Sequence, residues 1–258
     1  MLQYDRTTGD EPECSWVVIY YHGGGLLVGE GDSEDLSSRR IVKDSEAFLH
    51  GLRLYSVGYR LRPQHPATTI VQDCVDAFDF VRGNHPRARA IVVGSSSGGQ
   101  LAALVTQRAS KASFQGVVLR CPVTSDAFSG REYVPEELRD LHTSAWDRSF
   151  DTSLLGVMQR DVPRDGLDRM PLEAEEESLK GMPRTWIQVC TNDVLYSDGA
   201  CYGRALRNAG AEVRTDVVWG WPHTFWLKAP HLQMAWEADK AMLEGLAWIA
   251  GDDQLMSG

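Results

Sequence analysis

The amino-acid sequence predicts an α/β protein in which a mostly parallel central sheet is flanked by helices and carries an inserted helical cap. Short β-branched apolar runs alternate with segments whose apolar residues recur at helical spacing. The apolar run 90–93 passes through a glycine-bounded turn at 94–98 into such a helical segment. The alternation stops over 125–182, where prolines and charged residues gather, and then resumes. We therefore predict a core made of residues 1–124 and 183–258, with the cap inserted between them.

Composition excludes several classes of partner. The chain has 258 residues, is 43% hydrophobic and has a formal net charge of −10. Nucleic acids and anionic membranes bind basic faces, so we expect neither as a partner. The five cysteines are scattered and form no C-x-x-C pair, so we expect reduced, mostly buried thiols, no disulfide framework and no metal site. No organic cofactor is expected either.

The sequence shows neither of the two features that would direct the protein out of the cytoplasm, a signal peptide and a membrane span. The residues before the first apolar run, 1–14, are polar and acidic, and no basic segment leads into an apolar stretch as in a signal peptide. No apolar run reaches the length of a membrane span. We therefore expect a cytoplasmic protein whose partner is a small molecule, and a homodimer stays open.

The first half of the chain supplies a strand and a glycine loop. The run 15–21 is continuously apolar, which suits a central strand covered on both faces. His22-Gly23-Gly24-Gly25 follows directly, and successive glycines leave main-chain N–H groups free to converge on a developing oxyanion. Next we predict a helix over 33–49 capped by its first residue, a strand over 52–61, and a helix through the apolar positions of 70–81.

Residues 94–98 fit the nucleophile-elbow pattern G-x-S-x-G, and they lie between a predicted strand and a predicted helix. A serine in such a turn is strained, and its neighbours are glycines because the strand and helix backbones pass close together. Its hydroxyl projects from the carboxyl end of the sheet at a helix amino terminus. Ser96 is therefore the candidate nucleophile.

The second half of the chain delivers two more polar groups at strand ends. Asp193 follows one predicted strand, and His223 follows the next. We predict the later strands at 114–119, 185–190 and 212–219, the last at a sheet edge, and helices at 200–208 and about 231–250.

These strand ends define a chemistry. Carboxyl ends of parallel strands meet at one edge, so the glycine loop, Ser96, Asp193 and His223 should converge. Their chain order is that of the α/β-hydrolases and differs from both protease orders. His223 would accept the Ser96 proton during attack on an acyl carbon, and Asp193 would orient the imidazole and stabilise its charged form. An acyl-enzyme would follow.

Six motifs run along about residues 15–250: His22-Gly23-Gly24-Gly25, Tyr59-Arg60-Leu61 with Pro63, His65-Pro66, residues 94–99, Asp193-Val194-Leu195 followed by Asp198-Gly199, and His223 with Phe225. Together they resemble the hormone-sensitive-lipase-like branch of the α/β-hydrolases. More loosely, the chain is similar to the small hydrolases that accompany fungal polyketide synthases.

The resemblance implies further roles and shows two departures. It implies that Asp193, rather than Asp198, is the triad acid, and that Gly24, Gly25 and Ser97 donate to the oxyanion. The family has an acidic residue before the nucleophile and alanine after it, where this chain has Ser95 and Ser97. The backbone donor survives, but the local hydrogen bonds should differ. Family members also have a longer part before the glycine loop, so we expect a shorter sheet at that edge and a cap built mainly from 125–182.

We predict a carboxylesterase that cleaves an ester of a mid-sized apolar acyl group. Trp146, Trp221 and Phe225 are expected to line the acyl site, because loops at the carboxyl ends of strands build pockets. One alternative is a thioesterase or lactone-forming acyl transferase that releases a polyketide-type acyl chain, since the triad does not dictate which nucleophile resolves the acyl-enzyme. The other is a non-catalytic small-molecule receptor on the same fold, which would need no triad.

Overall fold

The computed structural model describes residues 1–5, 14–147, 149 and 163–252 of the chain. Seven strands form one sheet in the order β1-β3-β2-β4-β5-β6-β7. Only β1 is antiparallel to its neighbour, β3, and every other pair is parallel, which confirms the predicted fold class. The strands are β1 (Leu2–Tyr4), β2 (Trp16–Tyr21), β3 (Leu52–Val57), β4 (Arg89–Ser95), β5 (Gly116–Arg120), β6 (Arg184–Asn192) and β7 (Val213–Pro222).

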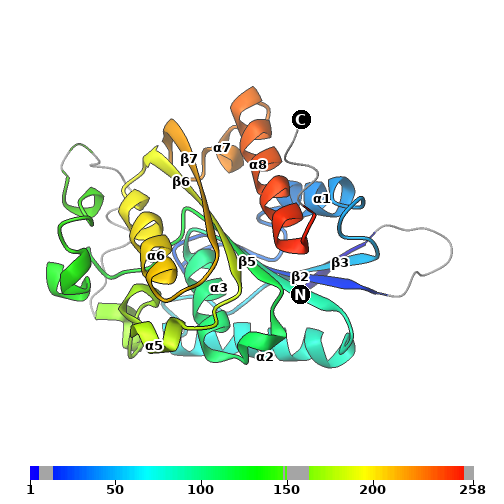
Figure 1. Ribbon diagram of the computed structural model, residues 1–258, viewed down its shortest axis with the longest axis horizontal. Coiled ribbons are helices and arrows are strands. Elements are labelled where there is room, and N and C mark those ends of the chain that lie inside the picture. The colour runs from blue at the N-terminus through cyan, green and yellow to red at the C-terminus, as the bar shows by residue number, and fades with distance from the viewer. Residues whose placement is uncertain (6–13, 148, 150–162, 253–258) are drawn as a thin grey trace.

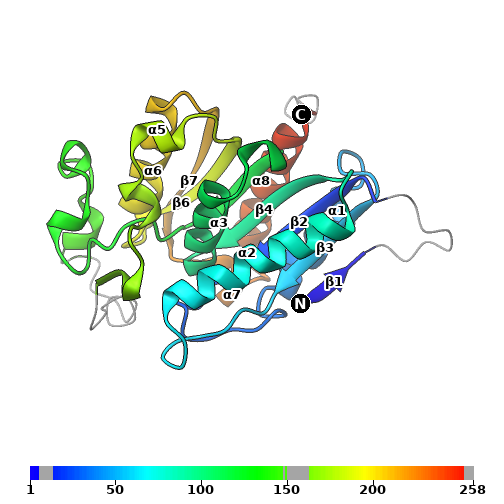
Figure 2. The same ribbon diagram turned by 90° about the horizontal axis from the view of Figure 1, so that it is seen from below.

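Helices cover both faces of the sheet. Figure 1 shows α1 and α8 on one side and α2 and α3 on the other, and Figure 2 shows the same layers from below. The helices of eight or more residues are α1 (Asp35–Asp44), α2 (Ala67–Asn84), α3 (Ser97–Arg108), α6 (Tyr196–Asn208) and α8 (Gln233–Ala250).

The central strand β2 shows why the sheet needs both layers. All six of its residues are buried, and successive side chains point to opposite faces. Val17 and Ile19 join the cluster that contains Phe78 of α2, whereas Val18 joins the cluster that contains Leu246 of α8. Each fully buried aliphatic side chain contributes about 1.5–3 kcal/mol, so the continuous apolar run fixes this strand in the middle of the sheet.

Two predicted elements end earlier than expected. The strand predicted over 52–61 stops at Val57, because Tyr59 turns inward and donates a hydrogen bond of 2.6 Å to the His22 carbonyl. The helix predicted over 33–49 is α1, which begins at Asp35 and ends at Asp44. Ser33 does not cap it: its hydroxyl accepts a hydrogen bond of 2.7 Å from the Glu30 amide.

The edges of the sheet differ. The last strand, β7, lies at one edge as predicted. At the other edge the three-residue strand β1 pairs with β3. This strand is not predictable from the sequence, because three residues are too few to show an apolar period.

The segment predicted as a cap contains only short helices in its described part. Figure 1 places its first half, in green, beside α6. Ser144 ties it to the core, because its hydroxyl donates a bond of 2.6 Å to the Val194 carbonyl and its amide donates to the Ser197 hydroxyl at 3.0 Å. Phe150 and the other predicted apolar positions of 150–162 lie outside the described residues. The short helices are η2 (Arg131–Tyr133), η3 (Glu136–Leu138), η4 (Ser144–Trp146), η6 (Pro163–Gly166), η7 (Pro171–Glu173) and α5 (Glu176–Leu179).

Among the described residues, no helix is long and apolar enough to cross a membrane. All five cysteines are free thiols, and four of them are buried, as predicted.

Candidate active site

Ser96 lies in a strained turn between β4 and α3. Its backbone dihedrals, φ 54° and ψ −121°, fall in a region that residues with a side chain rarely adopt. The flanking glycines are required by close packing. A Cβ on Gly94 would lie 2.1 Å from the Gly98 carbonyl oxygen, and a Cβ on Gly98 would lie 2.0 Å from that of Tyr21. The Ser96 amide donates to the Arg120 carbonyl at 2.8 Å, which holds the turn against β5.

The structure brings Ser96, His223 and Asp193 into one hydrogen-bonded chain. His223 Nε2 lies 2.9 Å from Ser96 Oγ, and His223 Nδ1 lies 2.7 Å from Asp193 Oδ2. The other carboxylate oxygen of Asp193 accepts the Leu195 amide at 2.9 Å, so both oxygens of this buried group are occupied. A serine hydroxyl, an imidazole bridging through both nitrogens and a buried carboxylate form the arrangement that nucleophilic acyl transfer requires.

Opposing effects set the pKa of His223. Burial lowers the pKa of this imidazole, but the charge and hydrogen bond of Asp193 outweigh burial and raise the pKa above its ordinary value. Contact with the Cys121 thiol raises it further. Asp193 therefore stabilises the charged, imidazolium form of His223.

The glycine loop lies next to the turn of Ser96. Gly24 and Gly25 have φ of 123° and 65°, in the left-handed region that favours glycine. None of the turn and loop hydrogen bonds among the described residues uses the amide of either glycine. Ser97 is the first residue of α3, so its amide belongs to those that a helix leaves without an intrahelical acceptor. These are the three amides that the resemblance predicts as oxyanion donors.

His22 and Tyr59 support the loop from behind. Their rings stack with centroids 4.2 Å apart, and His22 Nδ1 lies 2.7 Å from the Gly23 carbonyl oxygen. A Cβ on Gly29 would lie 2.4 Å from His22 Nδ1, so the loop returns directly over this ring. Burial lowers the pKa of His22, which favours the neutral form. The resemblance includes Tyr59 in a motif, but the sequence gives no sign of this packing.

The three aromatic residues predicted to bind substrate lie in two places. Trp221 and Phe225 lie on either side of His223 in the sequence and pack together, with ring centroids 4.6 Å apart, and Phe225 is only 3% exposed. Trp146 lies on η4, where its indole N–H donates to the Ala127 carbonyl at 3.1 Å and Arg131 lies over its ring. Their contact with substrate stays a prediction.

Cys121 was not predicted to lie in the site. Its sulfur, a His223 ring nitrogen and an Asp193 oxygen all lie within 4.8 Å of one another, and among the described residues this is the one group of such side chains that could hold a metal ion. Burial raises the pKa of the Cys121 thiol well above its ordinary value, so the thiol stays neutral. Its position at the carboxyl end of β5 is the signal that the sequence offered.

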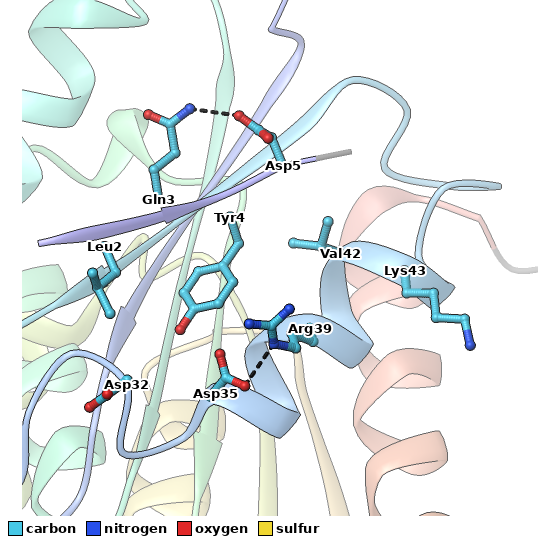
Figure 3. A pocket seen from close by; sticks show the side chains of 9 residues that line it. All are labelled: Leu2, Gln3, Tyr4, Asp5, Asp32, Asp35, Arg39, Val42 and Lys43. Carbon is cyan, nitrogen blue, oxygen red and sulfur yellow. Dashed lines mark hydrogen bonds and ion pairs between the residues drawn. The ribbon is translucent and has the colours of Figure 1, made fainter. Parts of the chain in front are cut away.

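A cavity of about 960 Å³ opens elsewhere, between β1 and α1 (Figure 3). Tyr4 points into it, and Arg39 forms an ion pair of 2.7 Å with Asp35 at its rim. None of its lining residues belongs to the Ser96 site. We assign it no part in the chemistry.

The fold and the site define the class, which is that of α/β proteins with a serine at a nucleophile elbow. A family model described as alpha/beta hydrolase fold matches residues 18–227. The chain belongs to this family, in its hormone-sensitive-lipase-like branch.

Relatives with curated names include esterases. Carboxylic ester hydrolase LipN of Mycobacterium tuberculosis is 30% identical over 226 residues, which are 81% of this chain and 57% of that protein. Versiconal hemiacetal acetate esterase of Dothistroma septosporum is 25% identical over 251 residues, 90% of this chain and 73% of that protein. FAD-linked oxidoreductase pytB of Aspergillus terreus is 30% identical over 246 residues, 90% of this chain but 29% of that protein.

The chain spans between 29% and 66% of the length of the first four curated relatives that it matches. Among solved structures, vibralactone cyclase superposes with a TM-score of 0.82 over 96% of this chain and 75% of that one. At 21% identity, that likeness shows the fold alone.

Proposed function

We propose that this protein is a carboxylesterase that cleaves an ester of a mid-sized apolar acyl group. Ser96 is the nucleophile, His223 the general base and then acid, and Asp193 the group that orients His223. The observation that carries the proposal is the hydrogen-bonded chain from Ser96 Oγ through both nitrogens of His223 to Asp193, built on a strained turn. Esterases among the relatives support the ester as the bond that is cleaved.

The reaction follows from these positions. As Ser96 Oγ attacks the ester carbonyl carbon, its proton moves to His223 Nε2, and the carbonyl oxygen becomes an oxyanion. The amides of Gly24, Gly25 and Ser97 donate to that oxygen. His223 then gives its proton to the alcohol that leaves, and an acyl-enzyme on Ser96 remains. Water, deprotonated by His223, attacks the acyl-enzyme and releases the acid.

We also propose that residues 125–182 form a cap that walls the acyl site. Its first half is bonded to Val194 and Ser197, directly after Asp193, so it lies beside the triad. Each buried methylene contributes about 0.8 kcal/mol to binding in an apolar pocket.

A series of straight-chain esters tests the function and the acyl size together. kcat/KM should rise with acyl length by roughly threefold to fourfold per methylene until the pocket is full, and Ser96→Ala should abolish the activity at every length. Thioesters of the same acyl groups serve as a second series, and faster thioester turnover would favour a thioesterase. A flat profile, or a maximum at acetate, contradicts the mid-sized acyl group.

An inert wild-type protein whose melting temperature still rises with an ester ligand would favour a receptor instead.

A further inference from the structure

A buried carboxylate lies behind the glycine loop and takes no part in the triad. Glu34 is 2% exposed and stands just before α1, yet its side chain does not cap that helix. A carboxylate is costly to bury unless hydrogen bonds replace its water. Three donors do so here: the Tyr20 hydroxyl at 2.6 Å, the Gly23 amide at 2.8 Å and the Ser95 hydroxyl.

Two of these donors are the immediate neighbours of the proposed catalytic groups. Gly23 precedes the proposed oxyanion donors Gly24 and Gly25, and Ser95 precedes the nucleophile Ser96. The Gly23 amide and the Ser95 hydroxyl bind the same oxygen, Glu34 Oε1. One oxygen atom therefore joins the oxyanion loop to the nucleophile elbow.

The loop and the elbow are also in direct contact at this point. A Cβ on Gly23 would lie 3.2 Å from the Ser95 carbonyl oxygen and 3.2 Å from Ser96 Cβ. Beyond the nucleophile, Ser97 makes a second connection, because its hydroxyl accepts the Leu26 amide at 3.3 Å. The two serines that replace the acidic residue and the alanine of the family pattern therefore both bind the glycine loop or its anchor.

We propose that Glu34 is a positioning residue for the oxyanion hole, and that it supplies, from the position just before α1, the carboxylate which the family carries directly before the nucleophile. The inference rests on the proposed function. Glu34 does not touch the substrate. Its carboxylate fixes the distance and angle between the oxyanion amides and Ser96 Oγ, on which stabilisation of the oxyanion depends.

Glu34→Gln tests the role with the smallest change of shape. The amide keeps one acceptor oxygen, but it loses the charge and places an NH₂ group opposite either the Tyr20 hydroxyl or both the Gly23 amide and the Ser95 hydroxyl. Removing a whole oxyanion donor costs about 100-fold to 1000-fold in kcat, so a displaced loop should cost about 10-fold to 100-fold with KM changed less than about threefold. Glu30→Gln changes an exposed residue of the segment between the glycine loop and α1. It is the matched control and should leave kcat unchanged.

A transition-state analogue separates positioning from general stability. A boronate or trifluoromethyl ketone of the best acyl group should bind Glu34→Gln more weakly by the same factor as kcat/KM falls. Tyr20→Phe removes a donor of the same carboxylate without touching loop or elbow. It should lower the melting temperature while leaving kcat within about threefold of wild type.

Moving the carboxylate provides the rescue. Glu34→Ala combined with Ser95→Asp places the acid directly before the nucleophile, and kcat should recover at least about tenfold over Glu34→Ala alone. The comparison of Glu34→Ala with the double variant also tests the positioning role if Glu34→Gln does not fold.

An unchanged kcat in folded Glu34→Gln overturns the positioning role. So does a loss of kcat that the double variant does not restore and that weaker binding of the analogue does not accompany. If Ser96→Ala retains activity, the proposed function itself has failed, which is a distinguishable result.

Discussion

Two histidine–aspartate pairs lie at the beginning of α6, and each has a serine beside it. His223 and Asp193 are joined at 2.7 Å, and Ser96 lies 2.9 Å from the other histidine nitrogen. His142 and Asp198 are joined at 2.6 Å, and Ser125 lies 3.2 Å from His142. The same three residue types thus meet twice. The two aspartates are five positions apart, Asp193 in the turn before α6 and Asp198 in its first turn.

The two pairs differ in which ring nitrogen of the histidine contacts the serine and which contacts the aspartate. His142 faces both Asp198 and Ser125 with Nε2, and within the described chain its Nδ1 has no hydrogen-bond partner. A proton taken from Ser125 through Nε2 would have to displace the bond to Asp198. His223 faces its two partners with opposite nitrogens, so it can accept a proton on one side while the carboxylate stabilises it from the other.

Solvent exposure and internal hydrogen bonding separate the two pairs as well. The His142 side chain is fully buried, whereas that of His223 is 14% exposed. Ser125 donates to Asp198 at 2.9 Å, and Asp198 also accepts the amides of Thr124 and Ser125. The Asp198 carboxylate is therefore fully engaged by internal hydrogen bonds, which tie the start of the predicted cap to α6. A histidine, an aspartate and a serine in proximity make a structural anchor unless the imidazole bridges them.

The largest expected effect separates the two serines. Ser96→Ala should lower kcat/KM by about 10⁴-fold or more while the protein folds normally. Ser125→Ala should leave kcat/KM within about threefold of wild type and cost about 1–2 kcal/mol of stability, because the hydroxyl serves only buried hydrogen bonds. Ester hydrolysis and thermal unfolding of both variants measure this.

A fluorophosphonate should label Ser96 alone in the wild-type protein. Labelling of Ser95, Ser97 or Ser125 would show that the nucleophile is assigned to the wrong serine.

The next largest effect separates the two acids. Asp193→Asn should keep the fold and lower kcat by roughly 10⁴-fold, because the amide no longer holds His223 in the correct tautomer. Asp198→Asn should cost far less activity but about 2–4 kcal/mol of stability, because the buried group loses its charge and one of the two oxygens that together accept four hydrogen bonds. Denaturant unfolding and kcat, measured on the same samples, make the comparison. Equal losses of kcat at both positions would leave the triad acid unassigned.

The two histidine–aspartate pairs also show which features of the structure can be predicted from the sequence. The fold class, the parallel strands and the elbow follow from apolar runs and glycine spacing, which act locally. The short helices and His142 could not be predicted in place, because no period marks the segment and its bonds run to Val194, Ser197 and Asp198. The role of Glu34 could not be predicted for the same reason. A charged residue before a helix is ordinarily solvated, and only the tertiary fold brings the Gly23 amide to the Glu34 carboxylate.

The smallest expected effect concerns pH and the Cys121 thiol. The free enzyme needs neutral His223, and its raised pKa means that kcat/KM should rise with pH along a limb centred above the ordinary histidine value of about 6.5.

Since contact with Cys121 contributes to that rise, Cys121→Ala should move the limb to lower pH, by less than about one unit, with little change in the plateau. Cys74→Ala, a buried thiol of α2, is the control and should move nothing.

Linkage gives the same pair a second signature in the folded state. Because folding raises the pKa of His223, the stability it contributes is fully present below about pH 6.5 and is lost as the pH rises through the folded value. The difference in unfolding free energy between wild type and Asp193→Asn should therefore be largest in mild acid and shrink toward alkaline pH. No such dependence should accompany Ser125→Ala, whose hydroxyl does not titrate. A limb centred below pH 6.5, or a difference that grows with pH, would mean that Asp193 does not stabilise the imidazolium and that the two pairs are more alike than their geometry indicates.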